Sequence, residues 1–132
     1  MAENGAPVAA RAWLVAGSIL VALVIWGSLM HNPPKIEMPI PQFDKLEHFG
    51  AYLLMTAWFA AAYPGRTRGL WIAAAFVALG GLIEILQGLS GYRDAEWLDW
   101  AADCLGVAAA FWYPRRWLTR LRMRLIVHAP DA

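Results

Sequence analysis

Cysteine is nearly absent from this sequence, since Cys104 is the only one among 132 residues. A single cysteine excludes an intramolecular disulfide, a CxxC redox motif and a cysteine-based metal cluster. The sequence also lacks a nucleophile motif, a glycine-rich phosphate loop and the ligand spacing of a zinc site. We therefore predict no cofactor and no metal from motifs, and we expect any site to be built from residues scattered along the chain.

Charged residues are also scarce, at 16% of the chain, whereas 60% of the residues are hydrophobic and eight are tryptophan. An ordinary soluble domain is about 45–50% apolar. The net charge of +1 is too small to favour a nucleic-acid partner. The composition instead indicates one membrane domain, covering residues 1–128, with membrane lipids as its immediate partners.

Four apolar runs predict an all-α bundle of four transmembrane helices. A helix needs about 20 mainly apolar residues to cross a bilayer, and runs of this length exclude barrel strands. The expected helices cover residues 11–30, 46–64, 69–90 and 97–114. The first run is too long for a signal peptide and has no clean cleavage site after it, so we expect it to stay in the protein.

The links between the runs are short except for residues 31–45, which hold four of the eight prolines. Such a segment cannot form a regular helix, so we expect an extended loop across a face of the bundle. Short links should make neighbouring helices antiparallel. Asp44, just before the second run, is the expected N-cap of that helix.

Lysine and arginine predict the orientation. With four crossings, the N-terminal flank, the second link and the C-terminal tail share one side and carry eight of the eleven basic residues. Cytoplasmic segments carry this excess, so both termini should be cytoplasmic in a multi-pass protein of the bacterial inner membrane. Residues 115–127 predict a basic amphipathic helix on the inner leaflet. The expected interfacial tryptophans are Trp13, Trp71, Trp112 and Trp117 inside, and Trp26, Trp97 and Trp100 outside.

The ionisable residues within the runs gather at one level, toward the outer face. Residues three or four apart share a helix face. The polar stripes are Lys45, His48 and Tyr52, then Glu84 and Gln87, then Asp99 and Asp103. Polar stripes in membrane bundles turn inward or line water, so we expect these stripes to converge.

Small residues accompany two of these stripes. Ala102, Gly106 and Ala110 recur every four positions, the small-xxx-small spacing of close helix packing in membranes. Gly80 and Gly81 lie one turn before Glu84 and can admit a neighbouring helix. Small residues are also common in membrane helices that do not pack closely, so both interpretations stay open here.

The same residues resemble the VanZ-like family, named for a membrane protein tied to teicoplanin resistance. That family shows K-x2-H-x3-Y, E-x2-Q, an Arg and D-x3-N-x2-G elements. Here these fall on Lys45, His48, Tyr52, Glu84, Gln87, Arg93, Asp99, Asp103 and Gly106. Asp103 stands where the family usually has Asn. The resemblance covers about half of the chain and implies a small multi-helix membrane protein without a settled activity.

We predict His48, Glu84 and Asp99 as catalytic acid–base groups. The predicted ligand-binding residues are Lys45, Tyr52, Gln87, Arg93 and Asp103. Structural alternatives stay open: a hydrogen-bonded His48 within the bundle, and an ion pair from Glu84 to Arg93 or Lys45. Such a set of side chains can also hold a divalent cation, although no known metal spacing is present. Asp94 and Glu96 should face solvent.

Two functions follow. In the first, the outer polar residues bind or process an amphiphilic envelope component, a lipid or a lipid-linked glycan, in a context linked to glycopeptide tolerance. In the second, the protein is a non-catalytic structural or accessory protein whose polar residues form a helix-packing network. The sequence leaves open the substrate, the oligomeric state and whether catalysis occurs.

Overall fold

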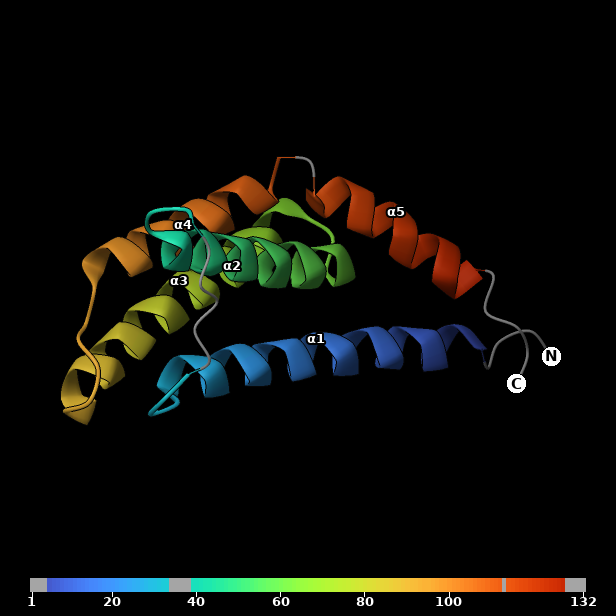
Figure 1. Ribbon diagram of the computed structural model, residues 1–132. Helices are drawn as coiled ribbons and strands as arrows, with labels where there is room; N and C mark the ends of the chain where they lie inside the picture. Colours follow the sequence, from blue (N-terminus) through green and yellow to red (C-terminus); the bar gives the residue numbers. More distant parts are fainter. Residues whose placement is uncertain (1–4, 34–38, 113, 128–132) are drawn as a thin grey trace.

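The computed structural model describes residues 5–33, 39–112 and 114–127, which form five α-helices and no strand. The helices are α1 (Gly5–Leu29), α2 (Phe43–Ala62), α3 (Arg66–Ser90), α4 (Trp97–Ala110) and α5 (Pro114–Val127). Figure 1 shows that consecutive helices from α1 to α4 reverse direction and that α5 continues beyond the end of α4. The all-α prediction is confirmed. Part of the proline-rich link, residues 34–38, lies outside the described residues.

The helix boundaries differ from the expected ones at several ends. α4 ends at Ala110 rather than at residue 114, and Pro114, which has no N–H to donate to the carbonyl of Ala110, begins the next helix. After α4, the backbone N–H groups of Phe111 and Trp112 donate to the carbonyls of Ala108 and Ala109, as in a tight turn. The N-cap of α2 is Gln42, in a left-handed conformation with φ of 57°, and Asp44 lies inside the first turn. The predicted N-cap role of Asp44 is therefore wrong.

Two helices are long and apolar enough to cross a membrane, namely α1, over Val8–Leu29, and α3. Neither helix is enclosed by protein, because most of each lies at the surface of the bundle. Among the described helices, α2 carries charged residues in its first turn, and α4 has only 14 residues, about 21 Å of helix. The structure thus shows two candidate spans, and four crossings stay a prediction.

α2 is the helix that the others surround, since it packs against each of the other four. Met55, Ala57 and Ala61 on its buried side have no exposed surface. Tyr52 and Met55 pack with Phe76 and Val107 from α3 and α4. The helix that carries Lys45 and His48 is therefore held on several sides, which fixes the direction of both side chains.

Gly106 brings α4 against the backbone of α2. A Cβ atom at Gly106 would collide with the carbonyl oxygen of Phe49 and would lie 3.0 Å from the backbone nitrogen of Leu53. Ala102 and Ala110, on the same face of α4, are buried. The predicted small-residue packing of this helix is confirmed.

Trp13 and Trp58 join α1 to α2. Their rings stack with centroids 4.0 Å apart, and each indole N–H donates to the backbone carbonyl of the other residue. Trp13 is only 6% exposed, so its predicted place in an interfacial belt is wrong. Trp100 is half-buried, and its indole N–H donates to the carbonyl of Val77. The other expected belt residues are exposed: Trp26, Trp71, Trp97, Trp112 and Trp117.

α5 packs back onto α1 and α2. Leu118 is buried beside Trp13 and Ala110, whereas Arg116 and Arg120 are exposed. The amphipathic helix expected at residues 115–127 is confirmed, with part of its apolar side covered by the bundle. Its contact with the inner leaflet stays a prediction.

Candidate functional site

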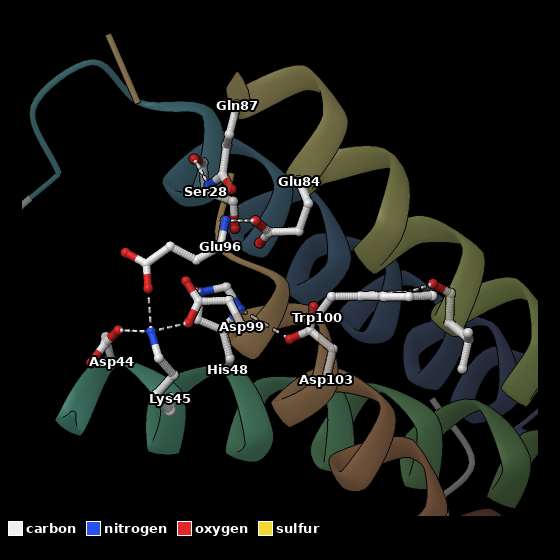
Figure 2. Close-up of polar contacts among 11 residues, drawn as sticks. Ser28, Asp44, Lys45, His48, Glu84, Gln87, Glu96, Asp99, Trp100 and Asp103 are labelled. Atoms are coloured by element: carbon white, nitrogen blue, oxygen red, sulfur yellow. Dashed lines mark hydrogen bonds and ion pairs between the residues drawn. The ribbon is translucent and has the colours of Figure 1, made fainter. Parts of the chain in front are cut away.

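Side chains from α2, α3 and α4 meet at one end of the bundle, where α2 and α4 begin and α3 ends (Figure 2). We call this group the polar cluster. Its members are Asp44, Lys45, His48, Glu84, Glu96, Asp99 and Asp103. The three predicted catalytic residues belong to it: single nitrogen or oxygen atoms of His48, Glu84 and Asp99 lie within 4.8 Å of one another.

Lys45 is the cation of the polar cluster. Its Nζ lies 2.6 Å from a carboxylate oxygen of each of Asp44, Glu96 and Asp99. Burial by itself would lower the pKa of Lys45, but the hydrogen bonds to the three carboxylates outweigh it and raise the pKa above its usual range. The Lys45 ammonium in turn lowers the pKa of the Asp44 carboxyl. Lys45 therefore stays charged and ties α2 to the start of α4.

His48 lies between two carboxylates from α4. Its Nδ1 is 2.9 Å from Oδ1 of Asp103, and its Nε2 is 3.6 Å from Oδ2 of Asp99. The first distance is a hydrogen bond and the second exceeds one. Gly80 of α3 makes room for Asp103, because a Cβ atom there would lie 2.7 Å from Oδ2 of Asp103. The close approach predicted for Gly80 is confirmed, and the group that approaches it is the carboxylate of Asp103.

Glu84 is 1% exposed and reaches the cluster from α3. Its Oε2 accepts a hydrogen bond of 2.7 Å from the backbone N–H of Glu96. Its Oε1 is buried and has no hydrogen-bond partner in the described part of the chain. The alternative of an ion pair from Glu84 to Arg93 or Lys45 is not formed among the described residues, where a backbone N–H at the start of α4 is the partner of Glu84.

Three predicted ligand-binding residues stand apart from these contacts. The side-chain amide of Gln87 donates a hydrogen bond of 2.8 Å to the backbone carbonyl of Ser28 and so ties α3 to α1. Tyr52 is 2% exposed, packs edge-to-face on Phe76, and its hydroxyl has no partner among the described residues. Arg93 forms no ion pair with an acid within the described ranges. Ligand binding by these three residues stays a prediction.

Two members of the polar cluster were not predicted. Asp94 is exposed, as expected, but Glu96 pairs with Lys45 although its side chain is 54% exposed. Asp44 joins the same ion-pair group. A signal for both was present in the sequence, since Asp44 lies in the first turn, and Glu96 at the N-cap, of a helix that carries a predicted polar stripe.

The polar cluster holds more acids than bases. Its five carboxyl groups stand against one ammonium and one imidazole, so full ionisation leaves three negative charges even with His48 protonated. Carboxylates and imidazole can exchange protons with a ligand, and they can also bind a cation. An isolated anion would be repelled.

Comparisons with protein-family models, curated proteins and solved structures find no match to this chain. The fold and the site therefore define its class by themselves: an all-α bundle with two candidate membrane spans and a polar cluster between three helices.

Proposed function

We propose that the protein is a VanZ-like, multi-pass integral membrane protein of the bacterial envelope whose polar cluster binds or processes the head group of an amphiphile. The head group belongs to a lipid or a lipid-linked glycan. α1 to α4 cross the inner membrane, both termini are cytoplasmic, and the polar cluster lies toward the outer face. The convergence of His48, Glu84 and Asp99 carries this proposal.

The outer surface of the bundle supports a lipid environment. Large apolar side chains are exposed on all four helices, among them Leu23 on α1, Leu54 on α2, Leu82 on α3 and Leu105 on α4. A soluble monomer rarely exposes apolar patches of this extent. Under the proposed orientation, basic residues concentrate at the end of the bundle opposite the polar cluster, as the positive-inside rule requires.

Unused bonding capacity favours a binding site over a packing network. Buried polar groups that only join helices are normally satisfied. The bonds of Gln87 to Ser28 and of Trp100 to Val77 join helices in this way. The polar cluster instead keeps an unpartnered oxygen on Glu84 and a surplus of acids. His48 and the carboxylates also lie in different surroundings, so one group can act as the acid and another as the base.

A binding assay on the purified protein tests the proposal. The protein is reconstituted in nanodiscs with phosphatidylglycerol, phosphatidylethanolamine or a polyprenyl-diphosphate sugar, and retained lipid is measured by native mass spectrometry. Asp99→Asn should lose the bound lipid, and any turnover should fall by about 100-fold or more, as for loss of an acid–base group. Glu47→Gln, a change of an exposed acid next to His48, should leave binding unchanged.

Thermal unfolding separates the two candidate functions. A packing network predicts that Asp99→Asn lowers the unfolding temperature and that no retained lipid depends on Asp99. A binding site predicts a folded variant that has lost its lipid. If folded Asp99→Asn retains as much lipid as the unaltered protein, the proposed function is wrong.

A further inference from the structure

We propose that His48, Glu84 and Asp99 form a binding site for one divalent metal ion. The ligands are Nε2 of His48, Oε1 of Glu84 and Oδ2 of Asp99, one from each of α2, α3 and α4. The metal site needs only these side chains, whereas its use in holding a head group rests on the proposed function.

The unpartnered oxygen of Glu84 is the first observation. Glu84 is 1% exposed, and its Oε1 is shielded from solvent without a hydrogen-bond donor in the described part of the chain. A carboxylate oxygen left without a partner in such a place is costly. Figure 2 shows that the Glu84 side chain points from α3 toward His48 and Asp99. A cation between these three side chains would satisfy the oxygen.

The orientation of the His48 ring is the second observation. Oδ1 of Asp103 lies 2.9 Å from Nδ1 of His48 and can accept its proton when the neutral ring carries that proton on Nδ1. In that tautomer the Nε2 lone pair faces Oδ2 of Asp99 at 3.6 Å, so a cation between the two atoms would have a ligand on each side. Metal-binding histidines commonly donate their other ring N–H to a carboxylate in this way.

The distances suit a bound ion. Two atoms that each lie about 2.0–2.2 Å from one ion are about 3–3.6 Å apart at the angles of tetrahedral and octahedral coordination. The 3.6 Å between His48 and Asp99 lies at the upper end of that spacing. One ligand atom from each of the three residues lies within 4.8 Å of the other two.

The charges around the three ligands also favour a cation. Lys45 binds Oδ1 of Asp99 and leaves Oδ2 for the ion. Its single positive charge is already compensated by three carboxylates, so it opposes a metal ion weakly. A divalent ion would reduce the negative surplus of the polar cluster and would let an anionic head group approach.

Mixed ligands indicate the kind of ion. One imidazole nitrogen and two carboxylate oxygens suit Mn²⁺ or Zn²⁺, whereas Mg²⁺ and Ca²⁺ prefer oxygen alone. Three protein ligands leave at least one position open for water or for a phosphate oxygen. The site is invisible to motif searches because each ligand comes from a different helix.

A titration with Mn²⁺ tests the site. Protein purified in detergent is stripped with EDTA, dialysed, and titrated while free Mn²⁺ is followed by electron paramagnetic resonance. One Mn²⁺ should bind per chain, and Zn²⁺ should compete for it. Glu84→Gln should weaken binding by at least about 10-fold, and Glu47→Gln, the same chemical change at an exposed acid, should not change it. Glu84→Gln keeps the acceptor for the Glu96 N–H, so its fold should persist.

Asp103→Asn supplies a second variant. The amide oxygen still accepts the His48 Nδ1 proton but makes the ring less basic, so affinity for Mn²⁺ should fall by about 10–100-fold. Absence of stoichiometric Mn²⁺ binding by the unaltered protein overturns the metal site. Unchanged binding in both variants, or equal loss in Glu47→Gln, overturns it as well.

The lipid assay with and without EDTA separates this inference from the proposed function. Lipid retention that disappears with EDTA and returns with Mn²⁺ supports the metal as the holder of the head group. Lipid retention that is indifferent to EDTA overturns that role and leaves the proposed function standing. Stoichiometric Mn²⁺ binding without any lipid retention supports the metal site and counts against the proposed function.

Discussion

Lys45 links three carboxylates that come from the first turn of α2 and from the start of α4. Its side chain is 17% exposed and that of Asp99 is 11% exposed, so this ion pair is largely removed from solvent. Coulomb attraction is stronger in such a place than at an exposed surface, and an unpaired charge is more costly. The stability of the polar cluster should therefore depend on Lys45 more than on any exposed base.

Replacing Lys45 should destabilise the protein. Lys45→Met keeps the aliphatic stem but leaves Asp99 without its cation. Breaking a fully buried pair costs about 3–5 kcal/mol, and we expect about 2 kcal/mol here because both side chains keep some exposure. Thermal unfolding in detergent measures the change. Arg93→Met, which removes a base that pairs with no described acid, should change stability little, and equal losses in the two variants would contradict this role for Lys45.

Single side chains show which part of the site a sequence can predict. Helical spacing correctly places His48, Asp99 and Asp103 on facing stripes, because periodicity fixes the face of a helix. Periodicity does not fix the partner. Charge alone suggests Arg93 or Lys45 for Glu84, but the nearest donor is a backbone N–H at the start of α4. Side-chain reach brings Glu96 to Lys45 across 51 positions, a pairing no local pattern encodes.

Contact between α4 and α2 depends on the absence of a side chain. Backbone atoms of Phe49 and Leu53 occupy the space in which a Cβ atom of Gly106 would lie. Backbone cannot rotate away as a flexible side chain can, so any added atom must push the helices apart. The same contact holds Asp99 and Asp103 of α4 beside His48 of α2.

Gly106→Ala should destabilise the pair of helices. We expect a loss of about 1–3 kcal/mol in thermal unfolding, the usual cost of overpacking. Gly50→Ala is the matched control, because Gly50 lies on α2 with nothing within 4 Å of its added Cβ. Alanine favours a helix over glycine by about 0.5–1 kcal/mol, so the control should be neutral or stabilised. Equal effects of the two substitutions would show that α4 does not depend on this contact.

The lengths of the apolar runs predict which segments form helices. They do not predict where every helix ends or which side chains it contacts. Pro114 marks a helix boundary in the sequence, yet the turn before it shortens α4 by four residues from the expected end. Trp13 fits an interfacial position by its place in its run. It stacks instead on Trp58, 45 residues away, a contact that only tertiary packing determines.

The whole molecule is polarised from end to end. One end carries the polar cluster, the middle exposes apolar side chains, and the first turn of α3 at the other end carries Arg66 and Arg68. The positions of the apolar runs and of the charged residues in the sequence predict this overall arrangement. They leave the number of crossings open, because α4 measures about 21 Å and the hydrocarbon core about 30 Å. A short helix can cross where the bilayer thins around it.

Cysteine accessibility distinguishes four crossings from two. In a Cys104→Ser background, Asp94→Cys reports on the link before α4 and Thr67→Cys reports on the first turn of α3, both at exposed positions. With four crossings and a cytoplasmic N-terminus, a membrane-impermeant maleimide should label Asp94→Cys in right-side-out vesicles. Thr67→Cys should react only after the vesicles are opened.

Crossing by α1 and α3 alone would reverse this result. The chain would then remain outside from the end of α1 to the start of α3, so Thr67→Cys would react in sealed vesicles and Asp94→Cys would be protected. α2, with His48, would then lie outside while the end of α3, with Glu84, lies inside, so the polar cluster could not form. The reversed labelling would therefore contradict the four crossings, the outward orientation of the site and the contacts among His48, Glu84 and Asp99.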